Sequence, residues 1–165
     1  EPHPALVTQH LIDDFHSPFV FYEPAFNLRS TDLNAFIRIG QLEKLDWMTE
    51  QRRANHARYL DRLSTSFYVQ KPPSGSQVAS ISVGLLAESR RQRQRIVQAL
   101  VARGIETRIF SAGNLGLHPF WTSRYGTTSF PVADRIHHCG FFLPNHAALT
   151  PDDVATISQV VLEAA

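Results

Sequence analysis

The sequence has few of the residues on which several classes of protein depend. Its single cysteine, Cys139, excludes an intrachain disulfide and favours a reducing compartment, which we expect to be the cytoplasm. Its only lysines are Lys44 and Lys71. Lys44 belongs to a charged helical stretch and Lys71 precedes two prolines in a predicted loop. Neither position therefore suits a lysine that forms a Schiff base.

Long apolar runs and a strong net charge are also missing. No stretch approaches the roughly 20 apolar residues of a membrane span, and the start of the chain has no signal-peptide pattern. The formal charge of +1 argues against a partner such as nucleic acid. The chain begins without methionine, which suggests a fragment. Its 165 residues, 43% of them hydrophobic, fit one domain or one domain with an arm.

The first third of the chain is predicted to hold an arm and two helices. Residues 1–29 are interrupted by prolines and are expected to form an irregular arm, with Phe19–Tyr22 as an edge strand or a segment against a partner. Residues 30–165 are expected to form the domain. Ser30 is predicted to cap its first helix, and Asp46 to begin the second. The inward residues of the second helix are predicted to be Ala54, Ala57, Leu60 and Leu63.

Strand and helix signals alternate along the rest of the chain. Ser89 and Gln92 form a capping box for a helix that ends at Gly104. Thr150 and Asp153 form a second box, at the start of the last helix. The other expected elements are a linker at 71–76, strands at 80–86, 105–110 and 140–143, a long loop at 111–130 and a short helix at 132–138.

Two polar side chains stand just before the first predicted helix. Asn27 and Arg29 offer an amide and a guanidinium, which are donors that suit a phosphate group. Polar residues also occur before amphipathic helices without any function. From the residues alone, both interpretations stay open.

A second group of polar residues follows the strand predicted at 105–110. Arg108, Asn114 and His118 supply a charge, an amide and an imidazole within eleven residues. A loop as long as 111–130 without structure of its own is uncommon unless it is functional. These three residues are therefore candidates for binding a substrate, although such a segment is also often only a connection.

The histidines near the end of the chain raise the question of a metal site. His137, His138, Cys139 and His146 match no common zinc spacing, and adjacent histidines on a helix converge poorly on one ion. We therefore expect no metal. Cys139 is predicted to be a small buried apolar residue.

A run of arginines begins the helix that follows Ser89. Such a run can bind nucleic acid, but no aromatic stacking platform accompanies it and the net charge is near zero. We expect a solvated helix face formed by Arg90, Arg91, Arg93 and Arg95.

Three strings of residues resemble one known family. The first is Phe26-Asn-Leu-Arg-Ser-Thr-Asp-Leu-Asn-Ala-Phe-Ile-Arg-Ile-Gly-Gln-Leu-Glu-Lys-Leu-Asp46, which departs from the family pattern mainly at Arg38. The second is Gly104-Ile-Glu-Thr-Arg108 with the following Ala112-Gly-Asn-Leu115, and the third is the Leu143-Pro144 ending of a strand. Together they resemble the C-terminal part of the DegT/DnrJ/EryC1/StrS sugar aminotransferase and dehydratase family, and most closely its deoxysugar 3-dehydratase branch.

The resemblance implies a fold, a cofactor and partners. The fold is α+β, a small and mainly antiparallel sheet with packed helices, as in the small domain of fold-type-I enzymes that use pyridoxal phosphate (PLP). Asn27 and Arg29 would bind the PLP phosphate of a dimer mate, and Arg108, Asn114 and His118 would bind a nucleotide sugar.

The implied enzyme is a 3-dehydratase or an aminotransferase acting on a nucleoside-diphosphate 4-keto-6-deoxyhexose, in deoxysugar or lipopolysaccharide biosynthesis. Its large PLP domain would lie upstream, with the lysine or histidine that decides between the two reactions. No catalytic residue is assigned in this chain, which alone would be inactive. The alternative is a non-catalytic dimerisation or ligand-binding module derived from that family.

Overall fold

The computed structural model describes residues 30–70 and 72–165 of the chain. The predicted arm and the segment Phe19–Tyr22 lie outside these residues. The structure divides after Gly40 into two parts that are described separately. The first described helix, α2 (Asp32–Leu42), is capped by Thr31, whose hydroxyl accepts from the Asn34 amide at 3.2 Å. The predicted helix is thus present, with Thr31 as its cap where Ser30 was expected.

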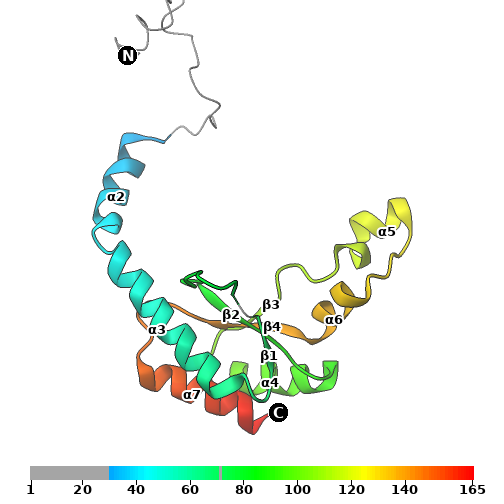
Figure 1. The fold of residues 1–165 in the computed structure, drawn as a ribbon. Helices are drawn as coiled ribbons and strands as arrows, with labels where there is room; N and C mark the ends of the chain where they lie inside the picture. The colour runs from blue at the N-terminus through cyan, green and yellow to red at the C-terminus, as the bar shows by residue number, and fades with distance from the viewer. Residues whose placement is uncertain (1–29, 71) are drawn as a thin grey trace, which may run out of the picture. The chain divides into compact units, whose positions relative to one another are not determined.

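A four-stranded antiparallel sheet forms the centre of the second part (Figure 1). Its order is β1-β2-β4-β3, with β2 and β4 in the middle, and residues such as Val83 and Leu143 directly opposite each other. The strands are β1 (Tyr68–Val69), β2 (Ser82–Leu86), β3 (Arg108–Ile109) and β4 (Gly140–Pro144). The predicted α+β fold with a mainly antiparallel sheet is confirmed.

One face of this sheet carries the core. Alternate residues of β2 and β4 point into it, which gives Val83, Leu85, Phe141 and Leu143 almost no exposure. Three helices supply the other side of the core: α3 (Leu45–Leu63), α4 (Arg90–Ala102) and α7 (Pro151–Glu163). Figure 1 shows α4 and α7 together on one side of the strands. Among the described helices, none is long and apolar enough to cross a membrane.

The two predicted capping boxes guide α4 and α7. Ser89 accepts from the Gln92 amide at 3.2 Å, although the Gln92 side chain returns to the Glu88 amide. Thr150 and Asp153 form the complete reciprocal box. The helix α4 ends just before Gly104, which adopts a positive φ of 70° as expected of a stop signal.

The inward side of α3 agrees with the prediction in part. Leu63 is buried and Leu60 packs against the core, but Ala57 is exposed, and the other buried residues are Asn55, His56 and Tyr59. The helix turns its polar residues inward because they find partners there. The Tyr59 hydroxyl donates to the Pro144 carbonyl at 3.0 Å, and the Asn55 amide donates to the Leu149 carbonyl at 3.1 Å.

The segment predicted as a loop at 111–130 is partly helical. It contains a 3₁₀ turn, η2 (Leu115–Leu117), and the helix α5 (Pro119–Tyr125), and it leads into α6 (Pro131–Cys139). Proline in the first turn begins both helices, a role that composition alone did not indicate. The predicted strand at 105–110 is reduced to β3, because only two of its residues pair with β4.

Candidate functional site

Arg108 lies on the edge strand β3 and is largely exposed. It forms an ion pair with Glu106, at 3.0 Å, in which both side chains face water. Exposed pairs of this kind contribute little stability. Arg108 lines an open cleft of about 1000 Å³ together with Ser82, Phe142 and His146. The guanidinium can therefore exchange Glu106 for an anionic ligand in this cleft at low energetic cost.

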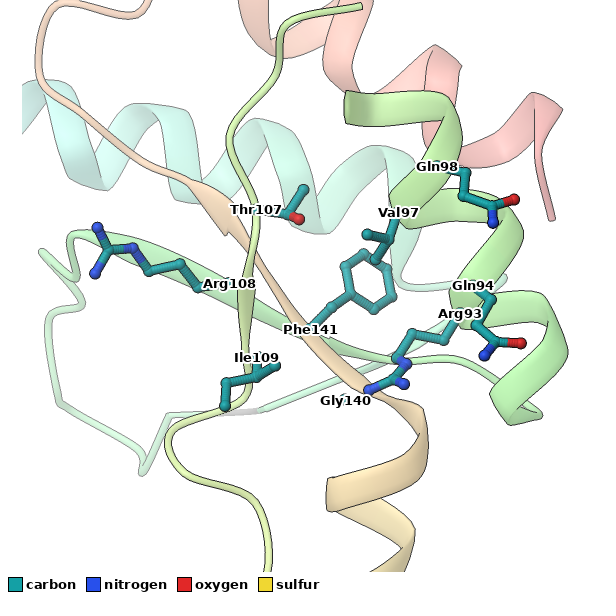
Figure 2. Close-up of a pocket in the computed structure, with 9 residues that line it drawn as sticks. All are labelled: Arg93, Gln94, Val97, Gln98, Thr107, Arg108, Ile109, Gly140 and Phe141. Carbon is teal, nitrogen blue, oxygen red and sulfur yellow. The ribbon is translucent and has the colours of Figure 1, made fainter. Parts of the chain in front are cut away.

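The two sides of β3 border different spaces. Figure 2 shows Arg108 pointing away from α4. Between β3 and α4 lies a second cavity of about 410 Å³, whose apolar lining includes Val97 and Phe141 (Figure 2). Because β3 is so short, α4 does not close this edge of the core.

Phe110 fixes the chain where it leaves β3. Its ring stacks on Phe142, with centroids 4.5 Å apart and planes 21° from parallel. Gly84 and Gly140 leave the space for it: a Cβ at Gly140 would lie 2.6 Å from the Phe110 Cβ, and one at Gly84 would overlap the ring. Side chains are therefore excluded at Gly84 as long as Phe110 keeps this position, and at Gly140 also by the Ile136 carbonyl, 2.6 Å from such a Cβ.

A tight turn follows directly. The Gly113 amide donates to the Phe110 carbonyl at 3.0 Å, and Ser111 takes a left-handed φ of 53°. Among the described residues Ser111 is the only non-glycine with a positive φ. Such a conformation costs on the order of 1 kcal/mol and is often found at functional sites. Ser111 also lines the cleft at Arg108.

Asn114 is buried and uses its side chain to hold the segment together. Its amide donates to Asp134 at 2.5 Å and to the Thr128 carbonyl at 3.4 Å, and its carbonyl accepts from the Gly116 amide at 2.8 Å. The structure thus places Asn114 at the centre of a network within the protein. Its contact with a substrate stays a prediction.

His118 lies near Asn114 but does not touch it. One of its ring nitrogens lies 2.9 Å from the Ala112 carbonyl. The Asn114 backbone amide instead donates to Nδ1 of His137 at 3.3 Å, and the rings of His118 and His137 are 6.5 Å apart. Asn114 and His118 thus both lie close to His137, whereas Arg108 lies on β3 and has no hydrogen bond to any of the three.

The surroundings of His137 favour the neutral form of its ring. Burial lowers its pKa first, and the charges of His138, His118 and Arg93 lower it further, against a smaller opposing effect of Asp134. Since Nδ1 accepts from the Asn114 amide, the proton of the neutral ring belongs on Nε2.

Asp134 also belongs to the hydrogen-bond network of Asn114, a role that the sequence did not indicate. It accepts from the Ser129 hydroxyl at 2.7 Å, from Asn114 and from the Phe130 amide at 3.1 Å. These hydrogen bonds, that of Ser129 first, lower the pKa of its carboxyl. A possible signal was its position near the start of the predicted helix at 132–138, where a carboxylate caps free amides.

The structure also places the remaining candidates. Cys139 is buried, as predicted. Within residues 30–70 and 72–165, no group of three or more His, Cys, Asp or Glu side chains is arranged to hold a metal ion. Asn27, Arg29 and Lys71 lie outside the described residues. Lys44 is exposed at the start of α3 and lines neither the Arg108 cleft nor the cavity beside α4.

Comparison with curated proteins identifies relatives among sugar dehydratases. The chain is 27% identical over 154 residues to GDP-4-keto-6-deoxy-D-mannose 3-dehydratase of Escherichia coli O55:H7, covering 90% of this chain and 40% of that protein. It is 30% identical over 134 residues to dTDP-4-dehydro-2,6-dideoxy-D-glucose 3-dehydratase of Saccharopolyspora spinosa, covering 75% and 29%. The chain thus spans less than half the length of these relatives.

Solved structures agree on the fold. An E. coli GDP-4-keto-6-deoxy-D-mannose-3-dehydratase with bound hydrated PLP superposes with a TM-score of 0.69 at 24% identity, over 91% of this chain and 40% of that one. The aminotransferase TlmJ from Streptoalloteichus hindustanus gives 0.72 at 28% identity, over 88% and 40%. The family model described as "DegT/DnrJ/EryC1/StrS aminotransferase family" matches residues 8–162. The resemblance found in the sequence is confirmed, and the chain belongs to the DegT/DnrJ/EryC1/StrS aminotransferase family.

Proposed function

We propose that this chain is the C-terminal part of a PLP-dependent enzyme of the cytoplasm that acts on a nucleoside-diphosphate 4-keto-6-deoxy sugar, for lipopolysaccharide or another glycan. This proposal rests mainly on the family match over residues 8–162, together with relatives that are named as 3-dehydratases of such sugars. Of the two reactions in the family, we favour 3-dehydration over amino transfer.

The described residues do not provide a covalent site for PLP, because Lys44 is exposed and lines neither cavity beside β3. When bound, PLP supplies an electron sink for the bond-breaking step. In our proposal the lysine or histidine that works with it belongs to another part of the full protein. Asn27 and Arg29 bind the PLP phosphate of the dimer mate.

The cleft at Arg108 suits the nucleotide sugar. Its guanidinium is exposed, and a diphosphate is a stronger partner than Glu106 because it can accept paired charge-assisted hydrogen bonds. Asn114 and His118 complete the site, Asn114 through the fold of the segment that it holds. The exposed apolar residues of α2 suit a homodimer contact: Leu33, Phe36, Ile37, Ile39 and Leu42.

The test uses the full-length protein that contains this chain, with PLP, glutamate and GDP-4-keto-6-deoxymannose. A product in which hydrogen replaces the 3-hydroxyl, seen by mass spectrometry as a sugar that has lost one oxygen while glutamate is oxidised, supports 3-dehydration. A product with an amino group in place of the keto oxygen supports transamination. Without PLP absorbance and turnover, the alternative of a non-catalytic module derived from the family takes its place.

Two variants test the site. Asn27→Ala should weaken PLP binding about tenfold, the effect of one charge-assisted hydrogen bond, and leave the Tm of the apo form unchanged. Asn34→Ala, at an exposed asparagine of α2, is the matched control.

Arg108→Gln should raise KM for the nucleotide sugar, whereas Arg103→Gln, also an exposed arginine with a carboxylate partner, should not. Equal effects of the two arginine variants would contradict the role of Arg108.

A further inference from the structure

A separate cavity of about 320 Å³ lies between the start of α4 and the end of α6. Two arginines and two histidines line it: Arg90, Arg93, His137 and His138. The rest of its lining is uncharged, from Ile109, Phe110, Gly113 and Ile136, and includes no carboxylate. Only Ile109 also lines the cleft at Arg108.

The basic groups of this cavity are positioned by the fold. Arg93 donates through Nη1 to the His137 carbonyl at 3.2 Å, which ties α4 to the last turn of α6. Figure 2 shows its side chain reaching from α4 toward Gly140. A guanidinium has five N–H donors, so others remain for a ligand. Arg90 lies in the first turn of α4, where the helix dipole also favours an anion.

The two histidines add donors. Because Nδ1 of His137 accepts from the Asn114 amide, its Nε2–H is the donor left for other groups. The rings of His137 and His138 are 5.0 Å apart, and the pKa of His137 is lowered by burial and then by the charges of His138, His118 and Arg93. Like charges gathered in this way repel each other, and a bound anion removes the repulsion.

We propose that this cavity binds the phosphate or diphosphate group of a small molecule. Arginine and imidazole N–H groups match phosphate oxygens in charge and geometry. The volume accommodates a diphosphate, and the apolar residues Ile109, Phe110 and Ile136 offer a surface for the organic group attached to it. Free phosphorylated metabolites and the diphosphate of a nucleotide share this chemistry.

The test is a titration of this chain with inorganic pyrophosphate and with GDP at constant ionic strength, followed by NMR of the histidine rings. Pyrophosphate should shift the His137 and His138 signals saturably and raise the pKa of His137. The His146 signal reports separately on binding in the cleft at Arg108, which His146 lines. Tighter binding of GDP would assign the site to a nucleotide, and equal binding to the phosphate group alone. No saturable shift with either compound would overturn the proposal.

Variants of neighbouring arginines separate a built site from general surface charge. Arg90→Gln should weaken pyrophosphate binding about tenfold, the effect of losing one charge-assisted contact. Arg91→Gln removes the same charge from the next residue of α4, which is exposed and does not line the cavity, and should leave binding unchanged. Equal weakening by the two variants would overturn the proposal. Since neither residue is buried, both variants should fold.

Discussion

The core of the domain and the segment 111–139 are stabilised by different forces. In the core, the sheet and the helices α3, α4 and α7 bury apolar side chains almost completely. In the segment 111–139 the buried residues are few, and the main links are hydrogen bonds of Asn114, Asp134 and His137. Apolar burial depends little on the identity of a ligand or on pH, whereas a polar network responds to both. The hydrogen bonds of the segment 111–139 can therefore change with pH or with a ligand while the core stays folded.

Apolar side chains show the same difference. All of Val154, Ile157 and Val161 in α7 are buried. The helices α5 and α6 and their connection leave Phe120, Tyr125, Phe130 and Val132 at least half exposed. The segment thus resembles α2, whose described residues are likewise unburied. We expect both surfaces to be covered in the full assembly.

The largest effect should come from the core. Leu143 in β4 has no exposed surface, and Leu143→Ala removes buried apolar atoms and leaves a cavity. We expect a loss of about 2–5 kcal/mol in the free energy of unfolding, measured by urea denaturation. Leu162→Ala in α7 is the control, because that side chain is 41% exposed and should matter far less. Similar losses for both would mean that the core is not the main source of stability.

Asn114→Ala should open the segment without unfolding the core. It leaves the Gly116 amide without its partner and removes one of the hydrogen bonds of Asp134, at a cost of about 1–3 kcal/mol to the local structure. Hydrogen exchange should accelerate at Gly116 by about 5- to 150-fold, while amides of β2 and β4 keep their protection. Asn34→Ala, at an exposed asparagine, is the control. Equal acceleration in the sheet would mean that the segment and the core unfold together.

The same division decides what could be predicted from sequence. The capping box of Thr150 and Asp153 was predicted because its partners are three residues apart. The burial of Tyr59 and Asn55 in α3 was not, since it depends on carbonyls 85 and 94 residues away, those of Pro144 and Leu149. Local patterns determine where helices begin, but distant partners determine which of their polar residues are buried.

For the candidate site, the sequence proposed residues, whose role in binding stays a prediction, and it did not indicate the hydrogen bonds among them. Arg108, Asn114 and His118 were selected by type and spacing, and the structure places Asn114 and His118 in one segment. Asp134 lies 20 residues from Asn114, and no periodic pattern connects the two. The helix α5 was missed because its composition is typical of a loop, and only Pro119 indicates its start.

Acid should weaken the protein through buried His56 and half-buried His137. Burial lowers the pKa of His56, and burial with the charges of His138, His118 and Arg93 lowers that of His137, both from an ordinary value of 6.5. Below pH 6.5 the unfolded chain therefore binds more protons than the folded one, so stability falls as the pH drops through the folded pKa values. We expect the free energy of unfolding, measured by urea denaturation, to decrease from pH 7.5 to pH 5.

His137→Asn separates the contribution of the segment from that of the core. Asparagine keeps an acceptor for the Asn114 amide and does not titrate. The free energy of unfolding of this variant should therefore decrease less between pH 7.5 and pH 5. His146→Asn, at an exposed position, should leave it unchanged. The pKa values of Asp134 and Asp153 are lowered by their hydrogen bonds, so these carboxylates respond only below this range. An unchanged slope in His137→Asn would remove His137 from the pH response.

The smallest effect should come from the turn that joins the two regions. Ser111 holds a left-handed φ of 53°, which costs an L-residue about 1–2 kcal/mol, whereas glycine adopts it freely but loses more backbone entropy on folding, about 0.5–1 kcal/mol. Ser111→Gly should therefore raise the free energy of unfolding by roughly 0.5–1 kcal/mol. Ser111→Ala keeps the strained backbone and should give no increase in the free energy of unfolding.

The same two variants test whether the serine hydroxyl contributes to the cleft that it lines with Arg108. If it does, Ser111→Gly and Ser111→Ala should both raise KM for the nucleotide sugar in the full-length enzyme, although only Ser111→Gly is more stable. Unchanged KM in both would leave Ser111 as a strained turn residue with no part in binding.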